Sequence, residues 1–522
     1  MVIEPLHSII AVDRFIQSTR DSGYKSTSSA IAELVDNALQ ADATVVAIQV
    51  VVADGDRPFP IRVSVADNGS GMSQELLREA LRFGGSSRFN DRRGLGRYGM
   101  GLPNASLSQA KRVEVYSWQR RGQGYWTYLD VDEISSSRMS EVPVPIKAVV
   151  PAWAGPIDAK SGTVVVWESC DRLDHRRINT VERKIARALG QTFRYFLWQG
   201  LQLSVNGVAV RPVDPLFLRK DAAVCGASLF QKPEVIEVYR DPDNPKLGAG
   251  KITVTFSELP IAEWHDRTND EKRKVGITNG AGVSMVRGSR EVDFGWFFMG
   301  SKRRENYDDW WRCEIRFEPI LDEAFGITHT KQQIRPREHL VEAIQPLVET
   351  AAKALNARVR QAHVQIKSGK SAAGAEAIAE KQETRLKPIP RQSILVRDKT
   401  RIAELQRRNT IVRVLEKDRD SKALKYRLVE DDGSGAVFFH PVLGKNVVLG
   451  VLNPKHRFFR NLYQPLLELE HSPDTGFARA VQLLLLSAAR AEAMFTRSDE
   501  QAAVERFRHE WSDVLDVLLS AR

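Results

Sequence analysis

The sequence predicts an α+β protein built from roughly three domains. Patterns typical of helices and strands alternate over residues 1–200, and a second mixed unit follows over residues 201–360. A small β-rich stretch at residues 410–452 precedes an end, residues 478–522, that is helical by its apolar spacing. A chain of 522 residues is also longer than one hydrophobic core normally supports, which favours several domains.

The composition is ordinary for a soluble globular protein, with 42% hydrophobic and 27% charged residues. Cys170, Cys225 and Cys313 are far apart and form no C-x-x-C pair, so we expect neither a disulfide framework nor a zinc site. No stretch approaches the ~18 apolar residues of a membrane span. Residues 1–5 lack the basic start of a secretory signal. These features favour a cytoplasmic protein.

The first 200 residues carry the clearest local patterns. Residues 26–41 have apolar positions at helical spacing and begin with capping hydroxyls, which predicts a helix. Residues 361–400 combine a small-residue tract with a proline-bearing tract, and we expect a linker there. In chain order, the other expected elements are strands at residues 43–52 and 61–67, a helix at 73–82, a polar loop at 83–101, a helix at 102–109, strands at 112–118, 125–131 and 163–168, and a helix at 178–197.

Glu33, Asp36 and Asn37 form the first polar group, on the helix expected at residues 26–41. Glu33 and Asn37 are four residues apart, so they share a helix face. A carboxylate can orient and deprotonate a water, and an amide oxygen one turn further on can hold a hard cation such as Mg²⁺. The alternative is a solvated polar face without chemistry.

Asp67 begins the second group, at the end of an expected strand, and is followed by Gly69, Gly71 and Met72. An aspartate there can accept a hydrogen bond from an exocyclic amine while the glycine backbone closes over a ring. The alternative is a simple Asp-x-Gly turn.

The third group is glycine-rich and runs Gly94-Leu-Gly96-Arg97-Tyr98-Gly99-Met100-Gly101. A dinucleotide-binding motif would need a strand directly before it, but residues 86–93 are polar. The segment instead leads into an expected helix, so its amides could bind phosphates. Further donors are available from Ser86, Ser87, Arg88 and Arg97. The alternative is a flexible loop.

The fourth group is Ser161-Gly162-Thr163, in which Thr163 opens an apolar strand. Its hydroxyl could bond to Asp67 or to a base, and the alternative is an ordinary strand threonine.

The residues and order of these four groups resemble the GHKL ATPases, the superfamily of gyrase, heat-shock chaperones, histidine kinases and MutL, over residues 20–200. The resemblance implies a Bergerat-fold α/β sandwich, a mixed sheet backed by helices with a lid over the nucleotide, and ATP and Mg²⁺ as ligands. It implies Glu33 as general base, Asn37 as Mg²⁺ ligand and Asp67 as acceptor from adenine, with Asp36 in the usual acidic position. The implied nucleotide contacts are Asn37, Asp67, Gly69, Gly71 lining the base, Met72, Ser86, Ser87, the lid residues Gly96, Arg97, Tyr98, Gly99, Met100 and Gly101, then Leu102, and Thr163 supporting Asp67.

The lid sequence is most similar to that of MORC-type ATPases, whose bacterial relatives often lie beside restriction and phage-defence genes. A MutL lid would read Gly-Phe-Arg-Gly-Glu-Ala-Leu, which is absent. A histidine kinase would need a phosphoacceptor helix before the Glu33 helix, and too few residues precede it.

Thr328-His329-Thr330-Lys331-Gln332 resembles the loop that carries a lysine to the γ-phosphate in the transducer domain of GHKL dimer clamps. The resemblance implies a ribosomal-protein-like βαβ fold and a catalytic Lys331, and the alternative is a surface lysine. We therefore expect an ATP-binding domain at residues 1–200, a transducer domain at 201–360, a basic linker at 361–408 and a β-rich then helical region at 409–522.

The positive charge is concentrated after the expected transducer domain. Residues 351–408 hold 14 Lys and Arg against 5 Asp and Glu, a net charge of +9, and the whole chain has +10. Such a tract can neutralise DNA phosphates, and the alternative is a solvated linker without a partner.

These expectations combine into Mg²⁺-dependent ATP hydrolysis that drives homodimerisation of a DNA-associated clamp, in bacterial restriction or phage defence. Apolar positions in residues 1–23 could form a strap exchanged between subunits, or could pack on their own domain. The alternatives are a chaperone-like ATPase that remodels a protein client and a non-hydrolysing nucleotide-gated scaffold, and Glu33 argues against the scaffold.

Overall fold

The computed structural model describes two compact units of the chain. The described residues are 11–24, 26–53, 58–85, 100–155, 157–222, 224–278, 280–327, 333–390, 399–408, 424–431, 433, 435–444, 446–469 and 476–520. The first unit comprises Met1–Pro260 and Asp266–Asn356, and the second comprises Ile261–His265 and Ala357–Arg522. No helix in these ranges is long and apolar enough to cross a membrane.

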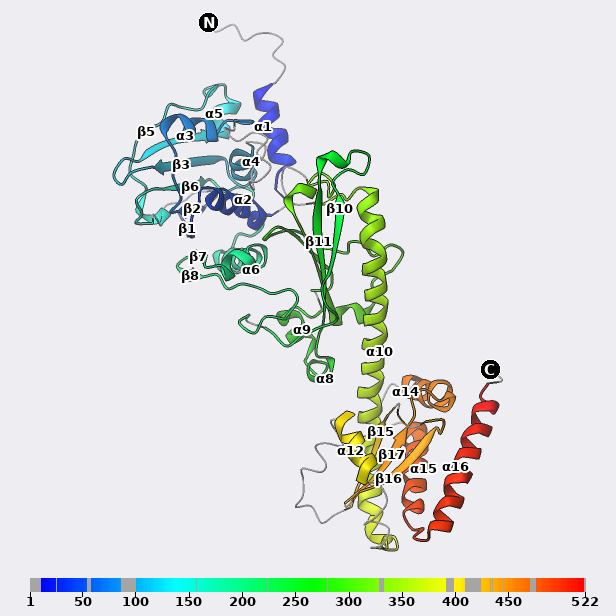
Figure 1. Ribbon diagram of the computed structural model, residues 1–522. Coiled ribbons are helices and arrows are strands. Elements are labelled where there is room, and N and C mark those ends of the chain that lie inside the picture. The colour runs from blue at the N-terminus through cyan, green and yellow to red at the C-terminus, as the bar shows by residue number, and fades with distance from the viewer. Residues whose placement is uncertain are drawn as a thin grey trace. The chain divides into compact units, whose positions relative to one another are not determined.

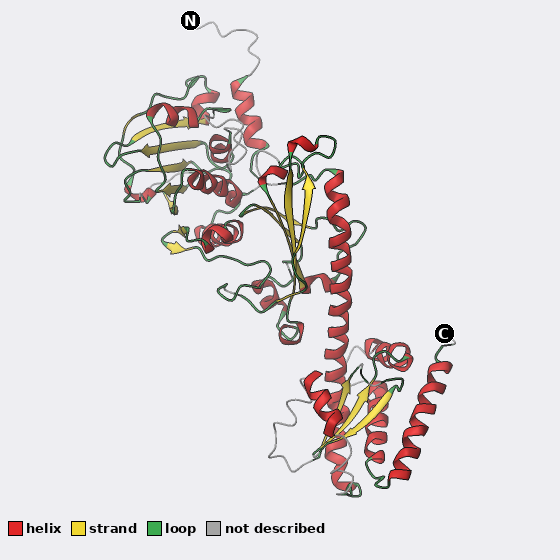
Figure 2. Ribbon diagram, viewed as in Figure 1, coloured by secondary structure: helices red, strands yellow, loops and turns green. Residues whose placement is uncertain are grey.

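The first unit contains two sheets (Figures 1 and 2). Among the described residues, the first sheet has eight strands in the order β5-β4-β3-β6-β2-β1-β7-β8. Its neighbouring strands are antiparallel except β1 and β7, which are parallel. The strands are β1 (Val45–Val52), β2 (Ile61–Asp67), β3 (Arg112–Trp118), β4 (Tyr125–Asp130), β5 (Ile146–Lys147), β6 (Gly162–Glu168), β7 (Gln202–Val205) and β8 (Val208–Ala209).

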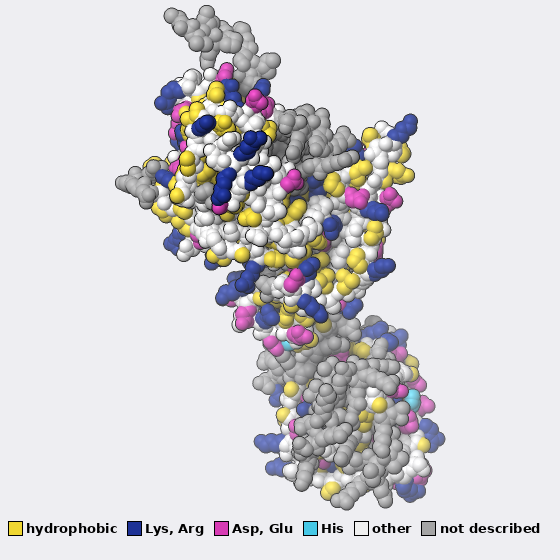
Figure 3. All heavy atoms as spheres, turned by 60° about the vertical axis from the view of Figure 1, so that its left-hand side comes forward, with side chains coloured by type: hydrophobic (Ala, Val, Ile, Leu, Met, Phe, Trp, Pro, Cys, Tyr) yellow, Lys and Arg dark blue, Asp and Glu magenta, His cyan; other side chains and the backbone are white. Residues whose placement is uncertain are grey.

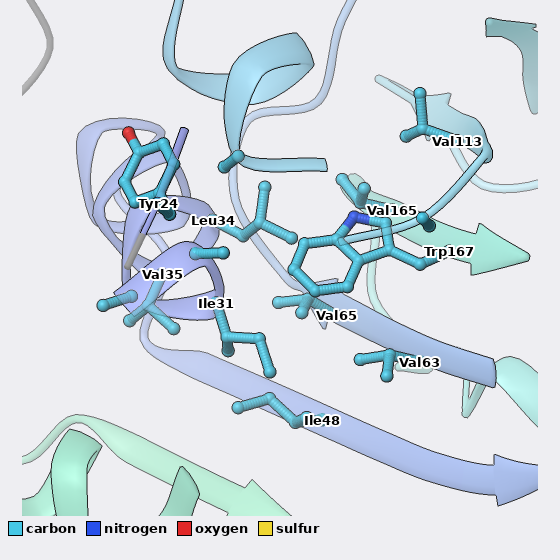
Figure 4. Packing of buried hydrophobic residues seen from close by; sticks show 14 of the residues in the cluster. Tyr24, Ile31, Leu34, Val35, Ile48, Val63, Val65, Val113, Val165 and Trp167 are labelled. Atoms are coloured by element: carbon cyan, nitrogen blue, oxygen red, sulfur yellow. The ribbon is translucent and has the colours of Figure 1, made fainter. Parts of the chain in front are cut away.

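Helices cover one face of this sheet and enclose the main core of the unit. Helix α2 (Thr27–Gln40) lies over the centre, where Ile31, Leu34 and Val35 point toward strand residues that include Val65 and Trp167 (Figure 4). Ser26 caps α2 in a reciprocal box with Ser29. The other helices of this part are α1 (Val12–Asp21), α3 (Gln74–Ala80), α4 (Gly101–Leu107), α5 (Val131–Ser135), η1 (Ala152–Ala154), α6 (Ile178–Thr192) and α7 (Arg194–Trp198).

The second sheet of the first unit runs β10-β11-β14-β12-β13, with β9 paired to β11. Residues Leu340, Ile344 and Val348 from the start of α10 (Glu338–Gln382) join its core. Its strands are β9 (Ser228–Leu229), β10 (Glu234–Tyr239), β11 (Ala249–Glu258), β12 (Val283–Arg287), β13 (Arg290–Gly295) and β14 (Trp311–Phe317). The accompanying helices are η2 (Pro245–Leu247), α9 (Asn269–Val275), η3 (Asn306–Trp310) and η4 (Pro319–Leu321).

The second unit is built around a small sheet in the order β15-β17-β16. Ala372 and Ala375 of α10 and Leu485 and Leu486 of α15 are buried in its core. Its elements are α8 (Ile261–Trp264), the remainder of α10, η5 (Glu383–Arg385), α12 (Lys399–Arg408), β15 (Lys425–Glu430), β16 (Phe439–Leu443), β17 (Val447–Leu452), the π-helix η6 (Phe458–Tyr463), α14 (Gln464–Leu469), α15 (Gly476–Glu492) and α16 (Ser498–Leu518).

The α+β class is confirmed, as are the strands expected in the first 200 residues and the helices expected before residue 178, with shifts of a few residues at their ends. Most of the loop expected at residues 83–101 lies outside the described residues. The helix expected at residues 178–197 is instead two helices, because Phe193 leaves helical geometry at φ −105° and ψ 18°. That break lets Phe193 stay buried while Arg194 turns toward the second sheet.

The linker expected at residues 361–400 is wrong as far as Gln382, since α10 continues through it. Alanine is the strongest helix former, and this small-residue tract is rich in it. Burial of Ala372 and Ala375 against the second core adds packing that the local pattern does not reveal.

Candidate active site

Three polar side chains stand in register across the middle of the first sheet. Thr163 on β6 pairs directly with Asp67 on β2 and with Ser117 on β3. All three follow the alternation of Val65, Val115 and Val165, so they share the face that α2 covers. The sheet therefore presents a short polar row at one edge of an apolar core.

Asp67 is a buried carboxylate with two backbone donors. Only 8% of the residue is exposed. The amide of Gly69 donates to its Oδ1 at 2.8 Å, and the amide of Thr163 also donates to the carboxylate. Burial raises the pKa of Asp67 to about 6, although both amides pull it down. A carboxylate held this way can accept from an amine donor placed against it.

Ser117 joins the side chains of this row to the glycine loop after β2. Its hydroxyl lies 3.0 Å from Thr163 Oγ1, donates to the carbonyl of Gly162 and accepts from the amide of Met72 at 2.8 Å. Thr163 thus supports Asp67 through its backbone amide, and its hydroxyl bonds to Ser117.

Gly69 and Gly71 allow this loop to lie against its neighbours. Gly71 has φ +65°, and a Cβ there would overlap the backbone carbonyl of Trp118. A Cβ on Gly69 would lie 2.8 Å from the carbonyl oxygen of Ala41, at the end of α2. Only glycine fits both positions. The Asp-x-Gly turn given as the alternative is therefore present, and it packs closely against Trp118 and the end of α2.

Glu33 is buried on α2, with 3% of the residue exposed. Its carboxylate lies against Gly101 at the start of α4, where a Cβ would clash with it. The hydroxyl of Tyr24 donates to Glu33. Burial, followed by the nearby carboxylates of Glu33 and Asp36, raises the pKa of the Tyr24 phenol. Glu33 therefore does not lie on a solvated helix face.

Asp36 forms a buried ion pair with Arg290 of β13. Arg290 Nε lies 2.9 Å from Oδ1 and 2.8 Å from Oδ2, and the two residues are 0% and 5% exposed. Burial alone would lower the pKa of Arg290, yet Asp36 and Glu33 outweigh it and raise that pKa. The acidic position next to Asn37 thus connects α2 to the second sheet.

Asn37 lies one turn after Glu33 on α2 and is partly exposed. Among the described residues, no group of three or more His, Cys, Asp or Glu could hold a metal ion. Mg²⁺ usually takes one or two protein ligands and completes its shell with phosphates and water. The amide oxygen of Asn37 is a suitable donor for such a site.

Several expected contacts lie outside the described residues, namely Ser86, Ser87, Gly96, Arg97, Tyr98, Gly99 and Lys331. The described part of the expected lid begins at Met100, the residue before α4, and Leu102 packs against the main core. The structure therefore places Gly101 against Glu33, one turn before Asn37 on α2. It gathers Asp67, Gly69, Gly71, Met72 and Thr163 around the polar row.

Sequence reasoning missed Tyr24, Ser117 and Arg290. Ser117 could have been found, because it continues the alternation of the apolar Val113 and Val115 with a polar side chain. Tyr24 gives a weaker signal, just before the capping serines. Arg290 gives none, since 254 residues separate it from Asp36.

Comparison with known proteins supports this site. Residues 24–158 match the family model described as histidine kinase-, DNA gyrase B- and HSP90-like ATPase. The match includes Glu33, Asn37, Asp67 and Ser117 and ends just before Thr163. No curated protein matches the chain. This part of the first unit is thus similar to the ATPase domain of the GHKL superfamily.

Proposed function

We propose that the chain is a Mg²⁺-dependent ATPase, most similar to bacterial MORC-type ATPases, that dimerises on binding ATP and encloses DNA. The observation that carries the ATPase proposal is the buried Glu33 carboxylate against Gly101, on the helix that also presents Asn37. A buried carboxylate next to a glycine-rich segment and a cation ligand suits hydrolysis of a phosphoanhydride.

In this proposal the polar row binds the base and α2 performs the chemistry. Asp67 accepts from the exocyclic amine of adenine, and Gly71 lines the ring. Glu33 accepts the proton of the attacking water, and Tyr24 holds its carboxylate in place. Asn37 would hold Mg²⁺, which supplies neutralisation of charge on the phosphates. Lys331 would add a positive charge at the γ-phosphate.

The expected domain boundaries remain part of the proposal. Strands β1 to β6 of the first sheet lie within residues 1–200, and its last two strands, β7 and β8, lie just beyond at residues 202–209. The second sheet lies within the proposed transducer domain, residues 201–360. The ion pair of Asp36 with Arg290 gives these two parts a direct connection.

DNA binding is supported by the basic tract, residues 351–408, where acidic side chains are paired with arginines and basic side chains are exposed. Its acidic residues Glu376, Glu380 and Glu383 pair with arginines of the second unit. The basic side chains with described exposure on α10 and just beyond are exposed: Lys353, Arg358, Arg360, Lys381, Arg385 and Lys387. On the face in Figure 3, the basic side chains of the first unit are mixed with acidic and apolar ones.

A chaperone-like ATPase that remodels a protein client is the second candidate. Helix α16 favours it, because Phe507, Val514 and Leu518 share a helix face and are 65%, 54% and 68% exposed. Exposed apolar faces often bind other proteins.

Two measurements test the clamp. Light scattering with and without a non-hydrolysable ATP analogue should show a dimer only with the analogue. With the analogue present, the protein should then stay bound to closed circular DNA at a salt concentration that releases it from linear DNA. A protein that stays monomeric, or leaves both DNAs equally fast, is no clamp.

A set of charge variants tests the basic tract. Replacing Lys381, Arg385 and Lys387 with Gln should reduce the slope of log affinity against log salt by about 0.9 for each DNA phosphate that the variant no longer neutralises. The matched control replaces the exposed Lys232, Lys246 and Lys274, which lie outside the tract, and should leave the slope unchanged. Turnover stimulated by an unfolded protein but not by DNA would favour the chaperone candidate.

A further inference from the structure

Two neighbouring residues on β13, one basic and one acidic, both contact residues 1–200, the proposed ATP-binding domain. Arg290 pairs with Asp36 of α2. Glu291 accepts from Arg194 at 2.7 Å and from Gln191 at 2.7 Å. Adjacent strand residues point to opposite faces, so this strand reaches two separate elements, α2 and the α6–α7 junction.

The second of these connections is itself part of a buried network. Arg194 is fully buried and also pairs with Glu314 of β14 at 2.6 Å and donates to Ser284 of β12. Three strands of the second sheet thus hold one guanidinium that comes from residues 1–200. The sheet is therefore fixed firmly at the α6–α7 junction, and its contact with α2 is a separate, smaller one.

The backbone of β13 is irregular beside these residues. The register between β12 and β13 shifts between Met285 and Val286, so Met285 pairs with Asp293 and Val286 with Glu291. A β-bulge re-aims the side chains next to it. Here it lies directly after the pair of residues that contact the ATPase part.

The Asp36–Arg290 pair lies close to the reacting groups. Asp36 stands between Glu33 and Asn37 on α2. The charge of Arg290 acts on Tyr24, whose hydroxyl donates to Glu33. A displacement of Arg290 would therefore change the position of α2 and the field at Glu33 together.

We infer that Arg290 is a positioning residue for ATP hydrolysis, which holds Glu33 and Asn37 in place through Asp36 and couples them to the second sheet. This inference rests on the proposed ATPase function. Arg290 does not bind nucleotide in this inference. Its Nε contacts both carboxylate oxygens of Asp36, and a lysine has a methylene group at that place in its side chain, so its nitrogen would lie one bond further out.

The test removes both charges at once, because a single removal would leave an unpaired buried charge. The double variant Asp36→Asn/Arg290→Met should keep ATP affinity within about threefold, as it leaves the polar row intact. Its single-turnover hydrolysis rate should fall about 10–100-fold, the loss expected from misplacing a reacting group by about 1 Å. Arg290→Lys should recover part of the rate.

The matched control is the ion pair between a buried arginine of β12 and a partly exposed aspartate after η4. Arg287 contacts Asp322 at 2.7 and 2.8 Å and is 7% exposed, and this pair does not involve α2. The variant Arg287→Met/Asp322→Asn should hydrolyse ATP at the wild-type rate. An equal loss of rate in both double variants would mean that general stability, and not positioning, explains the effect.

Thermal melting shows whether each variant is folded. If the folded Asp36→Asn/Arg290→Met variant hydrolyses ATP at the wild-type rate, the inference is overturned. The proposed ATPase function would still stand in that case, provided that the wild-type protein hydrolyses ATP and Glu33→Ala does not. If that double variant does not fold, a folded Arg290→Lys variant with a wild-type rate overturns the inference instead. Absence of hydrolysis in the wild-type protein would count against the proposed function itself.

Discussion

Ser117 and Thr163 face each other across β3 and β6 with their hydroxyl oxygens 3.0 Å apart. Ser117 also accepts from the amide of Met72, so one buried hydroxyl connects the third strand of the polar row to the glycine loop. Because Asp67 lies on the other side of Thr163, the geometry of the region proposed to bind the base depends on residues from three strands.

Ser117→Ala should therefore weaken ATP binding as well as stability. The change leaves the partly buried amide of Met72 without its acceptor, a loss of about 1–3 kcal/mol. Ser64→Ala is the control, since Ser64 is also fully buried and donates to a carbonyl, that of Ala154. Calorimetry should show weaker ATP binding only for Ser117→Ala. Equal affinities for the two variants would remove Ser117 from the site.

Gly71→Ala should abolish ATP binding and destabilise the first unit. The added Cβ would overlap the Trp118 carbonyl, and the residue would need φ +65°. Gly122 has φ +78° with nothing within 4 Å of an added Cβ, so Gly122→Ala isolates the cost of backbone conformation, about 1–2 kcal/mol. Melting temperatures should fall much further for Gly71→Ala. Similar melting temperatures would mean that Gly71 is not tightly enclosed.

Asp67 should make stability depend on pH. Its folded pKa of about 6 lies above the usual 3.8, so its contribution is complete below about pH 4 and is lost as pH rises through 6. The loss amounts to roughly 3 kcal/mol for about two pKa units. Melting temperatures of Asp67→Asn relative to wild type should therefore rise between pH 4 and pH 7. A difference that stays constant over this range would contradict the burial of an ionised Asp67.

ATP binding should show the opposite dependence on the same group. The ionised carboxylate is the better acceptor, so wild-type affinity should fall as pH drops below about 6. Asp67→Asn should bind weakly at every pH, because its amide can present a donor where an acceptor is needed. Calorimetry of the two proteins across pH 5–8 separates this effect from titration of ATP itself, which is common to both.

The local sequence was sufficient to predict the elements that hold the site. Helix α2, strand β2 ending at Asp67 and strand β6 opening at Thr163 follow from apolar spacing, capping and glycine positions that act over a few residues. The Gly71 position was predicted from sequence for the same reason.

Contacts between distant parts of the chain could not be predicted in this way. The ion pair between Asp36 and Arg290 depends on how two sheets pack, and nothing near either residue indicates the other. Helix α10 was mistaken for a linker because its buried alanines gain their stability from a core formed by residues far along the chain.

The role of Glu33 is measured most directly by single-turnover hydrolysis of Mg-ATP alongside nucleotide binding. Glu33→Ala and Glu33→Gln should bind ATP like the wild-type protein and hydrolyse it about 10²–10⁴-fold more slowly, since each removes the general base. The exposed Glu75 of α3 provides a control, and Glu75→Ala should keep the full rate. Near-wild-type hydrolysis by folded Glu33→Ala would contradict the assignment of Glu33 as the base and with it the proposed site.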